Sequence, residues 1–114
     1  MNAAGKLRAR FKAGGEKSLK LIGATGQLGY GVPEPAFSAA LERAPDMIGA
    51  DMGSTDIGPT FLGSGDMATS PEQTRRDLAK LLTGARKLDI PLILGSAGSA
   101  GARPHLDATL AMLR

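Results

Sequence analysis

Residues 19–31, LKLIGATGQLGYG, set the pattern for the whole chain: a short apolar run leads at once into a glycine-rich loop. The same arrangement occurs twice more, in MIGADMGSTDIG at residues 47–58 and in IPLILGSAGSAG at residues 90–101. Nearly continuous apolar runs of this length are typical of strands that helices cover on both faces. We therefore predict three strands, each followed by a loop in which glycine permits a sharp turn and leaves backbone amides uncovered.

Helical periodicity fills the segments between these runs. Residues 33–44 repeat apolar side chains at spacings of three and four, which is typical of a helix with one buried face. The next helix begins with a capping box formed by Ser70 and Gln73. Its inner face is predicted to consist of Leu78, Leu81, Leu82, Ala85 and Leu88. A last helix begins at Pro104, and its predicted inward side chains are Leu106, Leu110 and Leu113.

Strands that alternate with helices form parallel sheets with right-handed crossovers. We therefore predict an α/β fold, a Rossmann-like three-layer domain with a short parallel sheet over residues 19–114. The helical pattern stops at Arg114 without a cap, and a three-stranded sheet keeps two open edges. The sheet is thus expected to be incomplete, as part of a larger fold that a further protein chain or a homo-oligomer completes.

Composition narrows the class of protein. The chain has 114 residues, which suits a single domain, and 42% of them are hydrophobic. No cysteine is present, so disulfides, thiolate nucleophiles and cysteine metal sites are excluded. Three phenylalanines and one tyrosine are too few for a base-stacking nucleic-acid surface. No apolar run approaches the roughly 20 residues of a membrane span. We expect a cytoplasmic protein that binds neither membranes nor nucleic acid.

The net charge of +3 comes from the amino-terminal segment. Residues 1–20 hold six basic side chains and one acid, whereas acids outnumber bases in the rest of the chain. We predict a flexible basic arm over residues 1–18. Three interpretations of this arm stay open, namely a solvated tail, a contact for an anionic partner and a targeting peptide.

The first loop resembles a nucleotide-binding fingerprint. Gly23, Gly26 and Gly29 are spaced as in that motif, which also needs a helix that points its amino terminus at the pyrophosphate. Pro33 follows almost at once and disfavours a helix there. We therefore interpret Gly26 and Gly29 as substrate-binding positions, and an NAD(P)-binding oxidoreductase domain stays as an alternative.

Two acids and two hydroxyl side chains follow the second apolar run: Asp51, Ser54, Thr55 and Asp56. Carboxylates this close together can divide acid and base roles, bind a divalent cation, or accept loop amides in a turn. We predict catalytic roles for Asp51 and Asp56, substrate-binding roles for Ser54 and Thr55, and no metal site.

The third loop offers backbone amides that can hold a carboxylate or phosphate. His105, the single histidine, opens the last helix at the same edge of the sheet. A neutral imidazole there can act as a base or a hydrogen-bond donor, and the alternative is a surface or capping role. We predict that His105 assists catalysis and that Ser96, Gly98 and Arg103 bind substrate.

The same loops carry a resemblance to a known family. The segments TGQLGYGVPE (25–34), GADMGSTDIGP (49–59), LGSG (62–65) and GSAG (95–98) resemble the amino-terminal region of the acyclic terpene utilisation AtuA-like family. The match covers roughly residues 19–113 and leaves out the basic arm. The resemblance implies a role in the catabolism of terpenoid or other carboxylic acids, often as coenzyme A esters, in proteins several times longer.

With what the resemblance implies, the loops predict part or a subunit of a catabolic enzyme, of lyase or hydrolase type, that acts on a small carboxylate or acyl-CoA-type substrate. Its reaction and cofactors are unknown from the sequence. A non-catalytic subunit that completes a larger enzyme is the main alternative.

Overall fold

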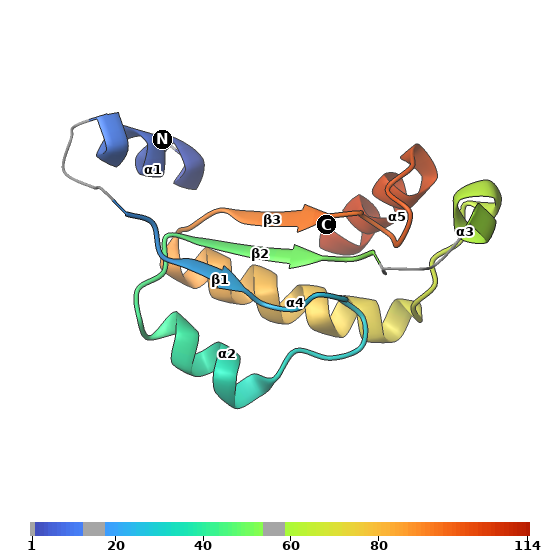
Figure 1. The fold of residues 1–114 in the computed structure, drawn as a ribbon, viewed down its shortest axis with the longest axis horizontal. Helices are drawn as coiled ribbons and strands as arrows, with labels where there is room; N and C mark the ends of the chain where they lie inside the picture. Colours follow the sequence, from blue (N-terminus) through green and yellow to red (C-terminus); the bar gives the residue numbers. More distant parts are fainter. Residues whose placement is uncertain (1, 13–17, 54–58) are drawn as a thin grey trace.

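The computed structural model describes residues 2–12, 18–53 and 59–114. Their order is α1 (Ala3–Lys12), β1 (Leu21–Gly23), α2 (Glu34–Leu41), β2 (Met47–Asp51), α3 (Pro59–Ser64), α4 (Pro71–Leu88), β3 (Leu92–Gly95) and α5 (Arg103–Leu113). Figure 1 shows the three strands side by side, with α2 and α3 on opposite sides of the molecule. The predicted α/β class and the three predicted strands are confirmed.

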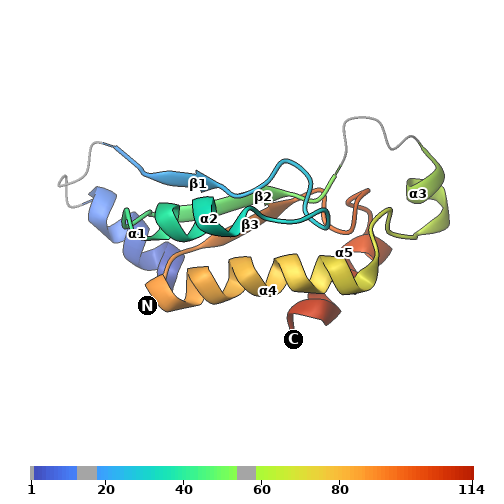
Figure 2. The same cartoon turned by 90° about the horizontal axis from the view of Figure 1, so that it is seen from below.

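The sheet is parallel throughout, in the order β1-β2-β3. Ile22 pairs with Ile48, and Ile48 pairs with Leu92. Both crossovers advance across the sheet in the same direction, so right-handed connections place α2 and α4 on one face. Figure 2 shows α4 running along that face of the sheet. Helices α2 and α4 pack closely on each other at Gly84 of α4. A Cβ added to Gly84 would lie 3.2 Å from the ring of Phe37 in α2.

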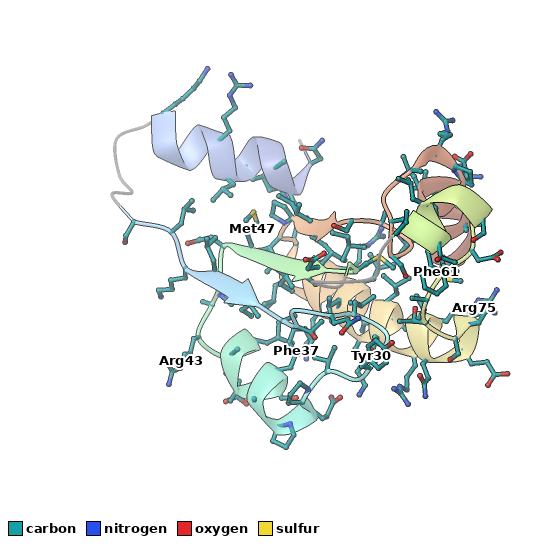
Figure 3. The ribbon with its side chains drawn as sticks, turned by 45° about the vertical axis from the view of Figure 1, so that its right-hand side comes forward. Tyr30, Phe37, Arg43, Met47, Phe61 and Arg75 are labelled. Atoms are coloured by element: carbon teal, nitrogen blue, oxygen red, sulfur yellow. The ribbon has the colours of Figure 1, made fainter. Side chains whose placement is uncertain are left out.

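The core fills the space between this face and the two helices. Figure 3 shows Phe37 on the side of α2 that points toward the sheet. Leu28, Ile48 and Leu81 have no exposed surface at all, and burial of each such side chain stabilises the fold by roughly 1.5–3 kcal/mol. The buried hydrophobic residues are Ile22, Leu28, Val32, Phe37, Ile48, Met52, Leu78, Leu81 and Ala85.

The other face of the sheet is open in the part of the chain that the structure describes. Side chains alternate along the strands, and on the face away from α4 Leu21 is 58% and Ile93 55% exposed, while Met47 and Gly49 of the central strand β2 are half-buried. The described residues therefore form two layers, a sheet and its helices. The second helical layer that the sequence predicted is not seen among them.

Helix α4 begins as predicted. Ser70 is the N-cap, and its Oγ accepts a hydrogen bond from the Gln73 amide at 3.2 Å. The predicted inner leucines at 78 and 81 are buried. The same face also buries two polar side chains that were not predicted, Thr74 and Asp77, each with no exposed surface.

The predicted inner face of α5 is wrong at Leu106 and Leu110, whereas the third predicted residue, Leu113, packs against the core. Leu106 and Leu110 are each 40% exposed, whereas His105 and Thr109 are buried. Leu106 and Leu110 are four residues apart, and so are His105 and Thr109. The helical period alone therefore does not decide which of these two neighbouring rows faces the core. The hydrogen bonds of His105, described below, turn its row inward.

Helix α1 lies within residues 1–18, which were predicted to form a flexible basic arm. Lys6 of α1 forms an ion pair with Asp89, which follows α4. No helix in the described part of the chain is long and apolar enough to cross a membrane.

Candidate functional site

The carboxyl ends of β2 and β3 bring Asp51 and Ser96 together. Asp51 pairs with Gly95 in the sheet register, and the Met52 amide donates to the Gly95 carbonyl at 2.9 Å. Gly53 lies between the two side chains, because a Cβ added to it would be 3.1 Å from Asp51 Oδ1 and 2.8 Å from Ser96 Cβ. Ligands bind at this edge in open parallel sheets.

Asp51 is exposed and partly held. Its Oδ1 accepts the Gly53 amide at 2.8 Å, which is a turn-stabilising bond between residues two apart. This bond fixes the direction of the carboxylate without covering it, so the group can still reach a ligand. Ser96 is exposed as well, and its backbone has a positive φ of 49°.

The first glycine loop is fastened to the same point. The Leu28 amide donates to the Asp51 carbonyl at 2.8 Å, and the Asp51 amide donates to the Thr25 carbonyl at 3.2 Å. The fully buried Leu28 anchors the loop in the core. Gly26 is exposed beside this junction, with nothing within 4 Å of an added Cβ.

The Asp77 carboxylate of α4 accepts backbone amides of the first glycine loop and so holds the loop in place. Its Oδ2 accepts the amides of Gly29 at 2.8 Å and Gly31 at 2.9 Å. Gly29 has a φ of +111°, and an added Cβ would approach the Thr69 side chain to 2.7 Å. The Gly29 amide that was predicted to bind substrate therefore serves the fold. No helix begins at the loop glycines, since α2 starts only at Glu34.

Two threonines support this arrangement beneath the loop. The Thr74 hydroxyl donates to the Ser70 carbonyl at 2.7 Å. Because a hydroxyl has one proton, the 2.7 Å contact between Thr69 and Thr74 places the donor on Thr69. These bonds hold Thr69, whose side chain packs closely against Gly29, on the first turn of α4.

The third loop uses its own amides internally. The Ser99 amide donates to the Ser96 carbonyl at 3.0 Å, and the Gly101 amide to the Ala97 carbonyl at 3.0 Å. The Ser99 hydroxyl accepts the Ala68 amide at 3.0 Å. Gly98 has a φ of +66°, and an added Cβ would lie 2.6 Å from the His105 carbonyl oxygen. The role of Gly98 in the structure is thus close packing on α5.

His105 has no exposed surface. Its Nε2 lies 2.8 Å from the Phe61 carbonyl and 3.1 Å from the Asp66 carbonyl. Both partners are acceptors, so Nε2 carries the proton, and the buried Nδ1 has no hydrogen-bond partner. His105 thereby ties α5 to α3 and to the residues that follow it. Figure 3 shows Phe61 at the end of the molecule where α3 meets α5.

Arg103 lies at the start of α5, with a side chain that is 82% exposed. Its Nε bonds both carboxylate oxygens of Asp107, at 3.0 and 3.2 Å. Exposed pairs of this kind are weak, so an anion can still compete for the guanidinium. Ser54, Thr55 and Asp56 lie outside the described residues.

The structure thus brings Asp51, Gly26 and Ser96 together at one exposed edge of the sheet. His105 is instead buried, and its hydrogen bonds hold residues 61 and 66 against α5. Sequence reasoning missed Asp77. The available signal was an acid on the apolar stripe of α4, one position before Leu78. Among the residues that the structure describes, no three histidine or acidic side chains gather where they could hold a metal ion.

Comparisons with protein-family models, with curated protein sequences and with solved structures found no match. The resemblance to the AtuA-like family accordingly stays a prediction.

Proposed function

We propose that this chain is part or a subunit of a catabolic enzyme that acts on a small carboxylate or acyl-CoA-type substrate, as the AtuA-like resemblance implies. The observation that supports the proposal is the pair of exposed side chains, Asp51 and Ser96, on either side of Gly53 at the carboxyl edge of a parallel sheet. The complete architecture in this proposal is Rossmann-like with three layers, and the protein is cytoplasmic.

Each residue has a stated role in this proposal. Asp51 acts as the general acid or base, because its carboxylate is exposed while one oxygen is held by the Gly53 amide. The Ser96 hydroxyl donates to the acyl carbonyl. The proposal keeps the predicted acid or base role for Asp56 and the predicted substrate-binding roles for Ser54 and Thr55, which lie outside the described residues. His105 supports the site by holding residues 61 and 66 in place.

A second candidate, a non-catalytic subunit that completes a larger enzyme, is favoured by the open sheet face. Leu21 and Ile93 are more than half exposed there, and large apolar side chains gathered on one face are typical of an interaction surface. The NAD(P)-binding alternative has less support, since Asp77 already occupies the Gly29 and Gly31 amides.

The test is an NMR titration of the protein with isovalerate, with isovaleryl-CoA and with NADH as probes. We expect saturable shifts in the amides of residues 51–53 and 95–97 with the carboxylate or the thioester. Asp51→Asn should weaken that binding or change the bound shifts, whereas Asp66→Asn, the same change at another exposed acid, should not. Saturable shifts with NADH alone would contradict the proposal, and so would no response to isovalerate and isovaleryl-CoA.

A further inference from the structure

Strand β1 presents an unpaired edge in the described sheet. It pairs with β2 on one side only. The Lys20 carbonyl accepts a bond from the turn before β2 at 2.8 Å, and the Ala24 amide donates to β2 at 2.9 Å. Because backbone groups alternate along a strand, the amides and carbonyls of Leu21 and Gly23 point away from β2. Such a row of groups is a template for another strand.

A hollow of about 720 Å³ lies along this edge, between β1 and α2. Residues 20–23 line one side of it, and Ala40, Arg43 and Pro45 line the other. A second hollow of about 230 Å³ continues past Ala36 and Ala40. Figure 1 shows α2 beyond β1, on the side away from β2. Helix α2 therefore underlies the position of a fourth strand, and its alanines leave room for side chains.

The hollow is basic at the end where β1 begins. Lys20 and Arg43 line it there, and Lys20 Nζ donates only a 3.3 Å bond to the Arg43 carbonyl. Neither side chain has an ion pair among the described residues. The neighbouring acid, Asp46, is buried and accepts the Lys20 backbone amide at 2.9 Å. A carboxylate on the incoming segment would complement the two cations.

We propose that the β1 edge binds an extended segment of another polypeptide, which adds a fourth strand over α2 and places a carboxylate beside Lys20 and Arg43. A second copy of this chain fits the edge poorly. In a two-fold dimer paired through β1, the partner's β1 would be the added strand. The partner's α2 would then lie under the pair of β1 strands, where the α2 of this chain already lies. An extended segment carries no such helix. This binding is independent of the proposed reaction, because the edge lies away from Asp51.

The charge of the segment is tested with synthetic peptides. The probes are fluorescein-labelled seven-residue peptides of alternating valine and threonine, with two glutamates at the amino or the carboxyl end, and matched peptides with lysines instead. Fluorescence anisotropy should show saturable binding of a glutamate peptide and binding about five-fold weaker for its lysine match. The better glutamate peptide reports the direction of the added strand.

Charge-reversed variants give the matched control. The double variant Lys20→Glu with Arg43→Glu should reverse the preference for glutamate over lysine. Arg75→Glu with Arg86→Glu, which changes the charge equally on the exposed side of α4, should leave it unchanged. Equal binding of both peptides, or an equal effect of both double variants, would overturn the assigned charge.

Strand addition is tested at Leu21. Leu21→Pro removes an outward amide without touching the bonds to β2 and should weaken peptide binding at least about ten-fold. Leu21→Thr keeps the amide and should stay within about three-fold. In the unchanged protein, bound peptide should slow hydrogen exchange of the Leu21 and Gly23 amides, which tests the contact even if the proline variant unfolds.

Three results would overturn the proposal. They are the absence of saturable binding, peptide binding without slower exchange at Leu21 and Gly23, and sedimentation that shows a dimer which Leu21→Pro dissociates. The last result would assign the edge to a second copy of the chain. Because these readouts use no substrate, their failure is distinct from a failure of the isovaleryl-CoA titration.

Discussion

Asp51 and Asp77 accept the same kind of hydrogen bond in opposite surroundings. Each carboxylate binds glycine amides, one amide in the case of Asp51 and two in the case of Asp77. Asp51 is exposed at the sheet edge, whereas Asp77 has no exposed surface. A buried carboxylate must be compensated by its partners, and an exposed one can exchange them for water or a ligand. The difference separates the carboxylate that holds the loop from the one available for chemistry.

The surroundings of Asp77 sharpen this contrast. Its Oδ1 is buried without a hydrogen-bond partner, and the Arg76 Nε lies 3.5 Å away. Arg76 is about half exposed, so this pair contributes little. The two glycine amides therefore provide most of the compensation for the buried charge.

The largest expected effect is that of Asp77→Ala. Removal of the carboxylate leaves the Gly29 and Gly31 amides without their acceptor, which should lower the free energy of unfolding by about 4 kcal/mol. Asp77→Asn keeps one acceptor oxygen and should cost about half as much. Urea unfolding measures both values. A change below about 1 kcal/mol for Asp77→Ala would show that the loop does not depend on this carboxylate.

The next effect is that of Gly29→Ala. The new Cβ would meet Thr69 at 2.7 Å in a backbone conformation with φ of +111°, so we expect a loss of about 3 kcal/mol. Gly26→Ala is the matched control in the same loop, since its Cβ would meet nothing within 4 Å. It should change the free energy of unfolding by less than about 0.5 kcal/mol. Equal effects in thermal or urea unfolding would contradict the loop geometry.

Local sequence signals predicted the frame of this fold. The apolar runs gave strands β1, β2 and β3, and the Ser70 to Gln73 capping box gave the start of α4. These features depend on neighbours within a few residues. The position of Asp51 and Ser96 at one edge followed from the parallel order of strands. All of this could be predicted without any long-range contact.

The role of Asp77 could not be predicted in this way. Its partners, Gly29 and Gly31, lie 48 and 46 residues away. Its place on the apolar stripe of α4 was the one local signal, and the neighbouring cations Arg75, Arg76 and Lys80 made a solvated aspartate the simpler interpretation. Burial of a polar side chain is decided by such distant partners, and the spacing of apolar residues carries no trace of them.

The prediction that Leu106 and Leu110 of α5 face the core was wrong for a related reason. Leucines at 106 and 110 are the natural inward choice by hydrophobicity, yet the helix turns His105 inward. Two backbone carbonyls outside α5 accept from its ring. The two contacts of Nε2 hold His105 inward, and Leu106 and Leu110 are left partly exposed.

His105→Ala should have an intermediate effect. The variant loses the contacts of Nε2 with two carbonyls and leaves a small cavity, for which we expect about 2 kcal/mol. Leu106→Ala, at the exposed neighbour on the same helix, should cost about 0.5 kcal/mol or less. Hydrogen exchange at residues 61–66 should rise in the histidine variant alone. If His105→Ala leaves both the stability and the exchange at residues 61–66 unchanged, His105 does not hold these residues in place. It would then again be a candidate for the acid or base.

The smallest effect on stability is expected for Asp51→Asn. The asparagine Oδ1 can still accept the Gly53 amide, and the site is exposed, so the free energy of unfolding should change by less than about 0.5 kcal/mol. Urea unfolding beside Asp77→Asn makes the comparison direct, because both variants remove the same charge. If Asp51→Asn destabilises the protein as much as Asp77→Asn does, both carboxylates serve the fold. If it leaves stability intact and still alters the isovaleryl-CoA titration, the exposed carboxylate is the one that acts on the substrate.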